Sequence, residues 1–251
     1  MTMQLQEYRV WDRSQRVFHW INALAVLTLV AIGTVILNAD ALGVPNPGKA
    51  ALKTAHVYVG YVFVLNLAWR LVWGFVGGHY ARYSALLPGG RGYGRRLAAF
   101  VKGFFSGRTP VYLGHNPLAR IFLSVLLLLL VVQAATGLVI AGTDVYMPPF
   151  GGTFREWAAA DTHDPALVRP YAPETVNAAA YAEMRAFRAP VVTIHEYGFF
   201  ALITLIAIHV AAAVIAELKE GGAIISSMFT GRKIHARRPE DAIEEGSDSA
   251  G

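Results

Sequence analysis

Four long apolar stretches constrain the fold of this chain more than any other feature of its 251 residues. They run over residues 17–37, 55–76, 118–141 and 191–216. A helix needs about 20 apolar residues to cross roughly 30 Å of hydrocarbon, and each stretch meets that length. None shows the alternation of barrel strands, and a backbone in lipid must satisfy its own hydrogen bonds. We therefore expect an all-α integral membrane protein, a bundle of four transmembrane helices.

The composition supports this expectation and excludes several other classes of protein. Hydrophobic residues make up 55% of the chain and charged residues 16%, whereas a soluble domain carries about 25% charged residues. Such hydrophobicity also excludes a disordered chain. The absence of cysteine rules out iron–sulfur clusters, zinc–thiolate sites and covalently attached haem.

The positions of lysine and arginine predict the orientation of the four spans. Basic residues gather before residue 17, in the connection 77–117 and after the last span, whereas the connection 38–53 carries few. By the positive-inside rule both termini are cytoplasmic and the 49-residue segment 142–190 is a periplasmic loop. The net charge of +5 is then explained by topology and anionic lipid, so no nucleic-acid partner is expected.

These boundaries predict a multi-pass membrane protein with one folded domain. That domain covers residues 1–238 and contains all four spans. The acidic end of the chain, residues 239–251, is predicted to be disordered. A short helix is expected over residues 173–188, entered through a proline, inside the periplasmic loop.

Four histidines lie in the spans or at their edges, where ionisable residues are rare and are functional candidates. His195 and His209 are 14 residues apart, which is roughly 21 Å along one helix and returns to nearly the same face. The predicted topology places His19 level with His209 near the cytoplasmic side. It places His56 level with His195 near the periplasmic side. Two histidine pairs at two depths are therefore expected.

Paired imidazoles in an apolar bundle suit haem iron, which takes one axial ligand on each face of the macrocycle. Zinc needs three or four ligands in one cluster, and these pairs are too far apart to merge. A relay of protons through buried histidines is the competing interpretation. It does not require two pairs at matched depths, so two stacked, non-covalent, bis-histidine haems b are favoured.

Two arginines and several glycines add to the candidate site. Arg70 lies 14 residues after His56 on the same predicted helix, and no carboxylate is expected at its depth, so a haem propionate is a candidate partner. Snorkelling to the headgroups is the alternative. Arg16 is a second candidate for the same role. Glycines near the histidines permit either close approach of a flat ligand or tight helix packing: Gly33, Gly60, Gly137 and Gly198.

These residues give the chain a family resemblance. It resembles the bacterial di-haem cytochrome b family of the cytochrome b-561 type, which includes the membrane cytochrome b subunit of nickel–iron hydrogenases. The resemblance covers residues 8–233 and depends on an ordered set of motifs: Arg16-x-x-His19-Trp20, His56-x-x-x-Gly60, Tyr112-x-Gly114-His115-Asn116-Pro117-Leu118, and His195-x-x-Gly198 followed by His209. It implies that His19 and His209 ligate one haem iron and that His56 and His195 ligate the other.

The resemblance also implies a respiratory electron-transfer subunit of a bacterial inner membrane. Such a protein passes electrons between a periplasmic redox partner, a c-type cytochrome or a hydrogenase-like catalytic subunit, and membrane quinone as an exchangeable substrate. Candidates for a quinone pocket are Arg16, Asn22, His115 and Asn116, although the last two also suit a helix cap before Pro117. The alternatives are a stand-alone quinol oxidoreductase that scavenges superoxide and a haem-free proton pathway.

Overall fold

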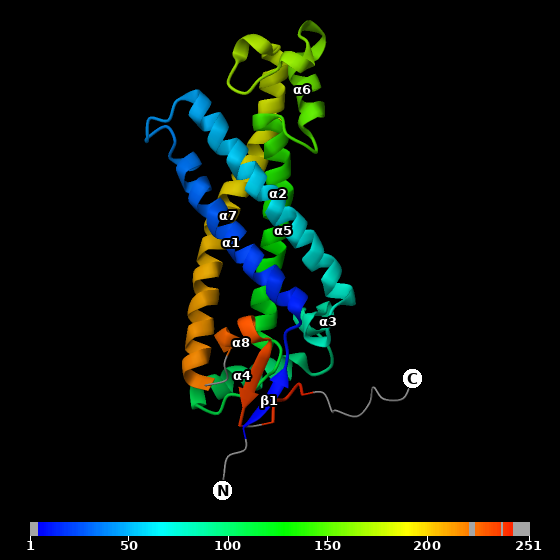
Figure 1. Ribbon diagram of the computed structural model, residues 1–251, viewed down its shortest axis with the longest axis vertical. Coiled ribbons are helices and arrows are strands. Elements are labelled where there is room, and N and C mark those ends of the chain that lie inside the picture. Colours follow the sequence, from blue (N-terminus) through cyan, green and yellow to red (C-terminus); the bar gives the residue numbers. More distant parts are fainter. Residues whose placement is uncertain (1–4, 221–223, 237, 243–251) are drawn as a thin grey trace. The chain divides into compact units, whose positions relative to one another are not determined.

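The computed structural model describes residues 5–220, 224–236 and 238–242, and its ordered elements are nearly all helices (Figure 1). Within this part of the chain, four helices are long and apolar enough to cross a membrane. They are α1 (Arg13–Leu37), α2 (Asn46–Val76), α5 (Pro117–Val145) and α7 (Ala178–Glu220). The four predicted spans are thereby confirmed as helices. All four extend beyond the predicted boundaries, α1 and α5 by about one turn and α2 and α7 by more.

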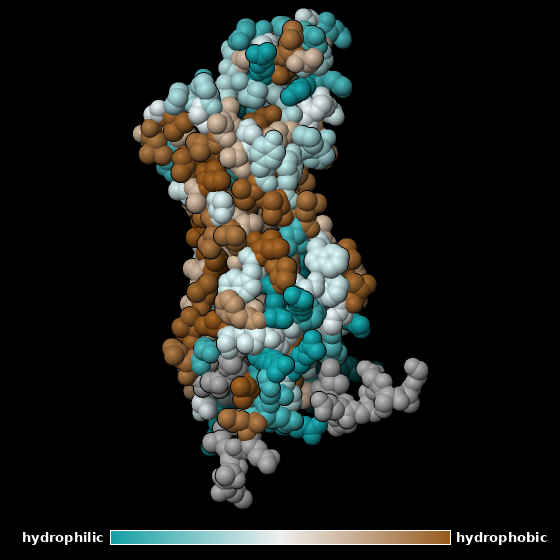
Figure 2. All heavy atoms as spheres, in the orientation of Figure 1, coloured by the Kyte–Doolittle hydropathy of each residue, from teal (hydrophilic) through white to brown (hydrophobic). Residues whose placement is uncertain are grey.

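The surface of these helices is apolar. Figure 2 shows hydrophobic side chains over the visible faces of α1 and α7. Leu24, Leu65 and Leu128 are each exposed over 60% or more of their area. Continuous apolar surface of this kind is found where lipid, rather than water, surrounds a protein.

Helix α7 corrects the prediction of a separate short helix over residues 173–188. It begins at Ala178 and continues through Pro190 into the apolar stretch. Asn177 caps it, because its side-chain oxygen accepts hydrogen bonds from the backbone N–H groups of Ala179 (3.1 Å) and Ala180 (3.0 Å). Pro190 removes one backbone hydrogen bond without ending the helix. Residues 173–175 form only a 3-10 turn before the cap.

The described residues divide into two compact units, and each long helix contributes to both. Among these residues, unit 1 comprises 5–20, 69–127, 206–220, 224–236 and 238–242, and unit 2 comprises 21–68 and 128–205. His19 and His209 belong to unit 1, whereas His56 and His195 belong to unit 2. That residues 1–238 act as one domain stays a prediction.

Unit 2 contains a packed lobe built from the predicted periplasmic loop. Helix α6 (Gly151–Ala159) shares an apolar core with the first turns of α7, and the 3-10 turns Ala160–Thr162 and Pro165–Leu167 contact α6. Met184, Ala158 and Val168 are almost fully buried in its core. A segment with its own apolar core is a structured element rather than a plain connection.

Unit 1 contains shorter elements and the exception to the all-α prediction. Its helices are α3 (Tyr83–Leu86), α4 (Tyr93–Ser106) and α8 (Ile224–Thr230), with a 3-10 turn at His79–Ala81. Strand β1 (Gln6–Arg9) pairs antiparallel with β2 (Arg232–His235), so that Gln6 faces His235 (Figure 1). This pairing joins segments from opposite ends of the chain, which local sequence patterns do not reveal.

The predicted start of the disordered tail, residue 239, also lies too early in the chain. Glu240 donates its backbone N–H to the Val111 carbonyl (2.9 Å), and the Asp241 carboxylate accepts backbone N–H groups of the loop before α5. Residues 239–242 are therefore part of unit 1. The remainder of the predicted tail, residues 243–251, lies outside the described residues.

Candidate functional site

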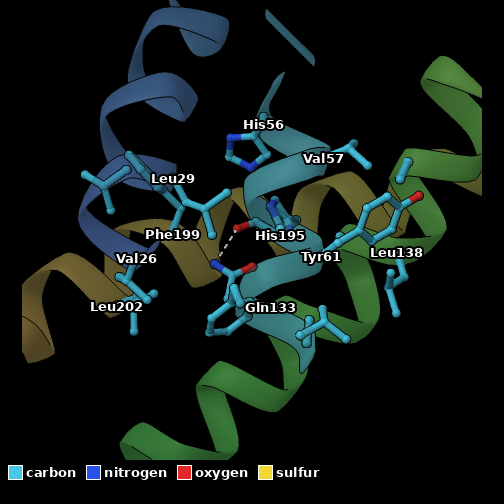
Figure 3. A pocket seen from close by; sticks show the side chains of 17 residues that line it. Val26, Leu29, His56, Val57, Tyr61, Gln133, Leu138, His195, Phe199 and Leu202 are labelled. Atoms are coloured by element: carbon cyan, nitrogen blue, oxygen red, sulfur yellow. Dashed lines mark hydrogen bonds between the residues drawn. The ribbon is translucent and has the colours of Figure 1, made fainter. Parts of the chain in front are cut away.

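A cavity in unit 2 brings His56 and His195 together. It has about 670 Å³ of space between atoms, part of it open to the outside, and its walls come from α1, α2, α5 and α7. The rings belong to α2 and α7 and are close enough to interact electrostatically. The side chains around them are mainly aliphatic and aromatic (Figure 3). This arrangement agrees with the predicted pairing of the two residues.

The hydroxyl of Thr136 determines which nitrogen of His195 is free. Its oxygen lies 2.8 Å from His195 Nδ1, and the hydroxyl itself donates to the Val132 carbonyl at 2.7 Å. Because that hydrogen is already used, Thr136 accepts the Nδ1–H proton, and His195 Nε2 keeps its lone pair. A histidine in this tautomer is prepared to bind a metal. Sequence reasoning missed Thr136, although it immediately precedes Gly137.

Two glycines accommodate the histidine rings directly. A Cβ atom at Gly33 would lie 3.4 Å from His56 Cε1, and one at Gly137 would lie 3.3 Å from His195 Cε1. The Nδ1 atom of His56 is buried without a hydrogen-bond partner among the described residues. Gly60 lines the cavity with open space beyond it. Gly137 also lines the cavity, but of the two only Gly60 has open space where a Cβ atom would lie.

Gly198 has a different role, which resolves the two interpretations left open for it. A Cβ atom there would lie 3.0 Å from Gln133 Nε2, and that nitrogen donates to the His195 carbonyl at 3.1 Å. The small residue on α7 therefore admits a side chain of α5, as in close helix packing. Gln133 is buried and was not identified from the sequence.

Unit 1 brings His19 and His209 within electrostatic range of each other. The ring of Phe122 is nearly parallel to that of His209, with centroids 6.3 Å apart, and Trp20 meets His19 edge to face at 5.1 Å. The Nδ1 atom of His19 is buried and has no hydrogen-bond partner in the described part of the chain. The second predicted pair thus also converges, between aromatic side chains.

Arg70 is buried in unit 1, with 3% of its surface exposed, so the snorkelling alternative does not describe this structure. Its Nη1 atom has no hydrogen-bond partner among the described residues, and its guanidinium lies 5.9 Å from the Phe18 ring. Asp12 interacts with it electrostatically without forming an ion pair. The prediction that no carboxylate lies at the depth of Arg70 is therefore corrected, because Asp12 is close enough to interact with it. The free nitrogen still leaves room for an anionic partner.

Arg16 already has a partner in the protein. One of its nitrogens donates to the Phe229 carbonyl, and its Nε is buried without a partner in the described residues. The contact ties the start of α1 to α8. Arg16 thus retains one donor for a ligand.

The four quinone-pocket candidates do not all converge in one unit. Arg16, His115 and Asn116 belong to unit 1, and Asn22 belongs to unit 2. Asn116 acts as the N-cap of α5, since its Oδ1 accepts the Ala119 N–H at 2.8 Å. The Oδ1 of Asn22 is buried without a partner among the described residues.

His115 lies beside a cluster of cationic side chains in unit 1. Its ring centroid is 5.0 Å from that of Trp11, and its Nδ1 is buried with no partner in the described part of the chain. Burial, together with the charges of Lys233, Arg70, Arg120 and His209, lowers the pKa of His115 to about 3. A neutral imidazole surrounded by cations attracts a ligand that carries oxygen atoms or negative charge.

A second polar centre in unit 2 escaped sequence reasoning. The buried carboxylate of Asp144 accepts hydrogen bonds from Lys53 of α2 (2.5 Å) and Arg188 of α7 (2.6 Å). It therefore ties α2, α5 and α7 together. Lys53 lies three residues before His56, which places this ion-pair network one helical turn from a candidate ligand.

Comparison with known proteins shows which family this chain matches. The sequence profile of the family described as "Prokaryotic cytochrome b561" matches residues 10–231. A protein of Cupriavidus necator named a probable Ni/Fe-hydrogenase B-type cytochrome subunit is 25% identical over 88% of this chain and 85% of its own length. A protein of Rhizobium leguminosarum bv. viciae with the same name is 26% identical over 95% and 93% of the two chains.

A shorter match links the chain to Escherichia coli. The protein of strain K12 named a probable Ni/Fe-hydrogenase 1 B-type cytochrome subunit is 28% identical over 44% of this chain and 50% of its own length. No solved structure matches the chain.

Proposed function

Because this chain belongs to the prokaryotic cytochrome b561 family, we propose that it is the membrane subunit that passes electrons between a Ni/Fe-hydrogenase catalytic partner and membrane quinone. Membership makes it a multi-pass b-type cytochrome of membrane electron transfer. The resemblance inferred from its motifs is confirmed. The observation that carries the proposal is the presence of one histidine pair in each unit: the Nδ1 atoms of His19 and His56 are buried without a partner among the described residues, and Thr136 holds Nδ1 of His195.

The residues present fit haem b in both units. In unit 2 the cavity between His56 and His195 is apolar, and Thr136 leaves Nε2 of His195 free. In unit 1 His19 and His209 lie between aromatic rings. Bound haem supplies an iron that gains and loses one electron. We assign two haems to these pairs, and a chain without cysteine attaches them non-covalently.

Arg70 is the residue we assign to a haem carboxylate in unit 1. A buried guanidinium with an unpartnered nitrogen requires an anion, and a carboxylate accepts two of its donors in parallel. Arg16, with its free Nε, is the second candidate. The charges of the two arginines would hold the haem carboxylate in one orientation and favour its ionised form.

Quinone is proposed to bind on the cytoplasmic side, at the histidine pair of unit 1. His115 is neutral at physiological pH, so its ring can offer either a donor or an acceptor to a quinone oxygen. The surrounding arginines and Lys233 favour ligand oxygens that gain electron density. Asn116 remains a candidate for the same pocket, whereas Asn22 belongs to unit 2 and is not assigned to it. We also assign both chain termini to the cytoplasm and the four spans to the inner membrane of a bacterium.

The lobe of unit 2 is proposed to meet the catalytic partner in the periplasm. Its core is packed, yet Phe150, Tyr171 and Phe187 remain between 38% and 47% exposed. Aromatic residues on a rigid support are typical anchors of protein interfaces. The relatives' names supply the hydrogenase as the partner. A c-type cytochrome is the other periplasmic redox protein that this lobe would suit.

A haem count on the detergent-purified chain tests the proposal. We expect two haems b per chain by pyridine haemochrome, and reduction of both by quinol in the reduced-minus-oxidised spectrum. His209→Ala should abolish quinol-dependent haem reduction. A colourless protein expressed with added haem would overturn the assignment and favour the proton pathway. Rapid haem reduction by superoxide without a partner would favour the stand-alone enzyme.

A further inference from the structure

The end of the described chain makes consecutive hydrogen bonds with the loop before α5. The Asp241 carboxylate accepts the backbone N–H of Leu113 through Oδ1 (2.6 Å) and that of Gly114 through Oδ2 (2.8 Å). Glu240 donates its own N–H to Val111, and Tyr80 donates its hydroxyl to the Asp241 carbonyl (3.0 Å). One carboxylate that receives two adjacent backbone donors forms strong, charge-assisted bonds.

The small residue Gly114 leaves space in the loop for this carboxylate. A Cβ atom at Gly114 would lie 2.8 Å from the Tyr80 ring and 3.2 Å from Asp241 Oδ2, so a side chain there would displace one of them. Leu113 is buried, with 2% of its surface exposed. The contact therefore depends on a specific residue on each side. Asp241 lies beyond residue 231, where the match to the family ends.

Strand β2 contacts the same loop one residue earlier. Lys233 is buried, and its Nζ lies 3.5 Å from the Tyr112 carbonyl and 5.6 Å from the Trp11 ring. Trp11 in turn packs on His115. Lys233, Glu240 and Asp241 thus contact four consecutive loop residues, 111–114, directly before His115.

We propose that Asp241 is a positioning residue for the quinone site, which holds His115 in the cationic cluster of unit 1 by fixing the backbone of Leu113 and Gly114. This inference rests on the proposed function and adds a residue that acts on the site through the backbone. His115 is the next residue after the bonded amides, so a shift of that backbone moves its ring relative to Arg70 and Arg120. Asp241 itself touches neither quinone nor haem.

A merely structural anchor would behave differently. If Asp241 served only to fasten the chain end, its loss would lower stability and leave the remaining folded protein with unchanged kinetics. A positioning residue changes how well the site binds its substrate in protein that is folded and fully loaded with haem. The two roles are therefore separated by the Michaelis constant for quinol, measured per haem.

The experiment compares Asp241→Asn and Asp241→Ala with wild type in the full-length, haem-loaded chain. For both variants we expect KM for a short-chain quinol to rise by about tenfold, the lower end of the range found when a partner that orients a metal ligand is lost. The spectrum assigned to the His56–His195 haem should not change. Asp241→Glu, which keeps the carboxylate, should recover part of the affinity.

Glu240→Gln is the matched control. It removes the same charge from the neighbouring residue but keeps the backbone N–H that binds Val111. We expect its KM to equal that of wild type. An equal rise in Glu240→Gln and Asp241→Asn would show a general charge effect and overturn the proposal.

Hydrogen exchange provides a readout that does not depend on activity. In wild type the amides of Leu113 and Gly114 should exchange slowly, and Asp241→Ala should speed their exchange by about tenfold or more. Fast exchange in wild type would overturn the inference even if no variant could be purified. Failure of wild type to react with quinol would instead refute the proposed function, and slow exchange at these two amides would still verify the contact.

Discussion

The two units surround similar histidine pairs with opposite environments. In unit 2, His56 and His195 face an apolar cavity, and the hydroxyl of Thr136 holds Nδ1 of His195. In unit 1, His19 and His209 share their unit with Arg70, Arg120, Lys233 and a neutral His115. Surrounding charge and solvent access tune a haem's reduction potential. The same ligands can therefore serve different partners at the two sites.

The largest expected effect is the loss of one haem without the other. His56→Ala should remove the haem of unit 2, and His209→Ala that of unit 1, because an iron that loses one of its two axial ligands is held much more weakly. In each variant the pyridine haemochrome count should fall to about half of the wild-type value. A single substitution that empties both sites would show that the two pairs do not bind independently.

The ion-pair network of unit 2 should contribute strongly to stability. Asp144→Asn leaves Lys53 and Arg188 without their common partner in a site where Asp144 is only 3% exposed. Breaking a buried pair in this way costs about 3–5 kcal/mol, and the partial exposure of the two cations places this case near the lower value. Thermal unfolding in detergent measures the loss.

Asp40→Asn is the control for that experiment. Asp40 pairs with Lys49, but its side chain is 94% exposed. The nearby ammonium lowers the pKa of Asp40, yet water and salt screen such pairs. No measurable change in the unfolding temperature is expected. An equal loss from both variants would contradict the distinction between buried and exposed pairs.

The hydroxyl of Thr136 should affect unit 2 alone. Thr136→Val keeps the side-chain shape but removes the acceptor that fixes His195, and we expect haem affinity at that site to fall by about 10–100-fold. Haem transfer to apomyoglobin measures the change. Thr204→Val removes a hydroxyl that bonds only a backbone carbonyl of the same helix, at 3.0 Å, and should leave haem affinity unaltered.

The smallest effects are expected at the two helix caps. Asn116→Ala in unit 1 and Asn177→Ala in unit 2 should each lower stability by about 1 kcal/mol. Asn116→Asp keeps the cap, so a rise in KM for quinol in that variant would show that Asn116 also contacts the substrate. Unchanged kinetics with restored stability would restrict Asn116 to capping.

Local patterns in the sequence predicted most of the architecture. Long apolar runs identified the four helices, because hydrophobicity and length are properties of each segment alone. The element boundaries were less accurate, since α7 continues through a proline and begins at a cap that lay inside the predicted loop. The lobe of unit 2 was predicted as a long loop with a role, but its core depends on contacts between turns that periodicity does not reveal.

The candidate site was likewise predicted in part from the sequence. The sequence by itself determined which histidines lie in or at the edges of the spans, and it predicted two pairs from helical geometry and the expected topology. Only the tertiary structure decided what orients them. Thr136 and His195 are 59 residues apart, and Asp241 and Leu113 are 128 residues apart. Hydrogen bonds over such separations exist only after the chain has folded, so no local pattern encodes them.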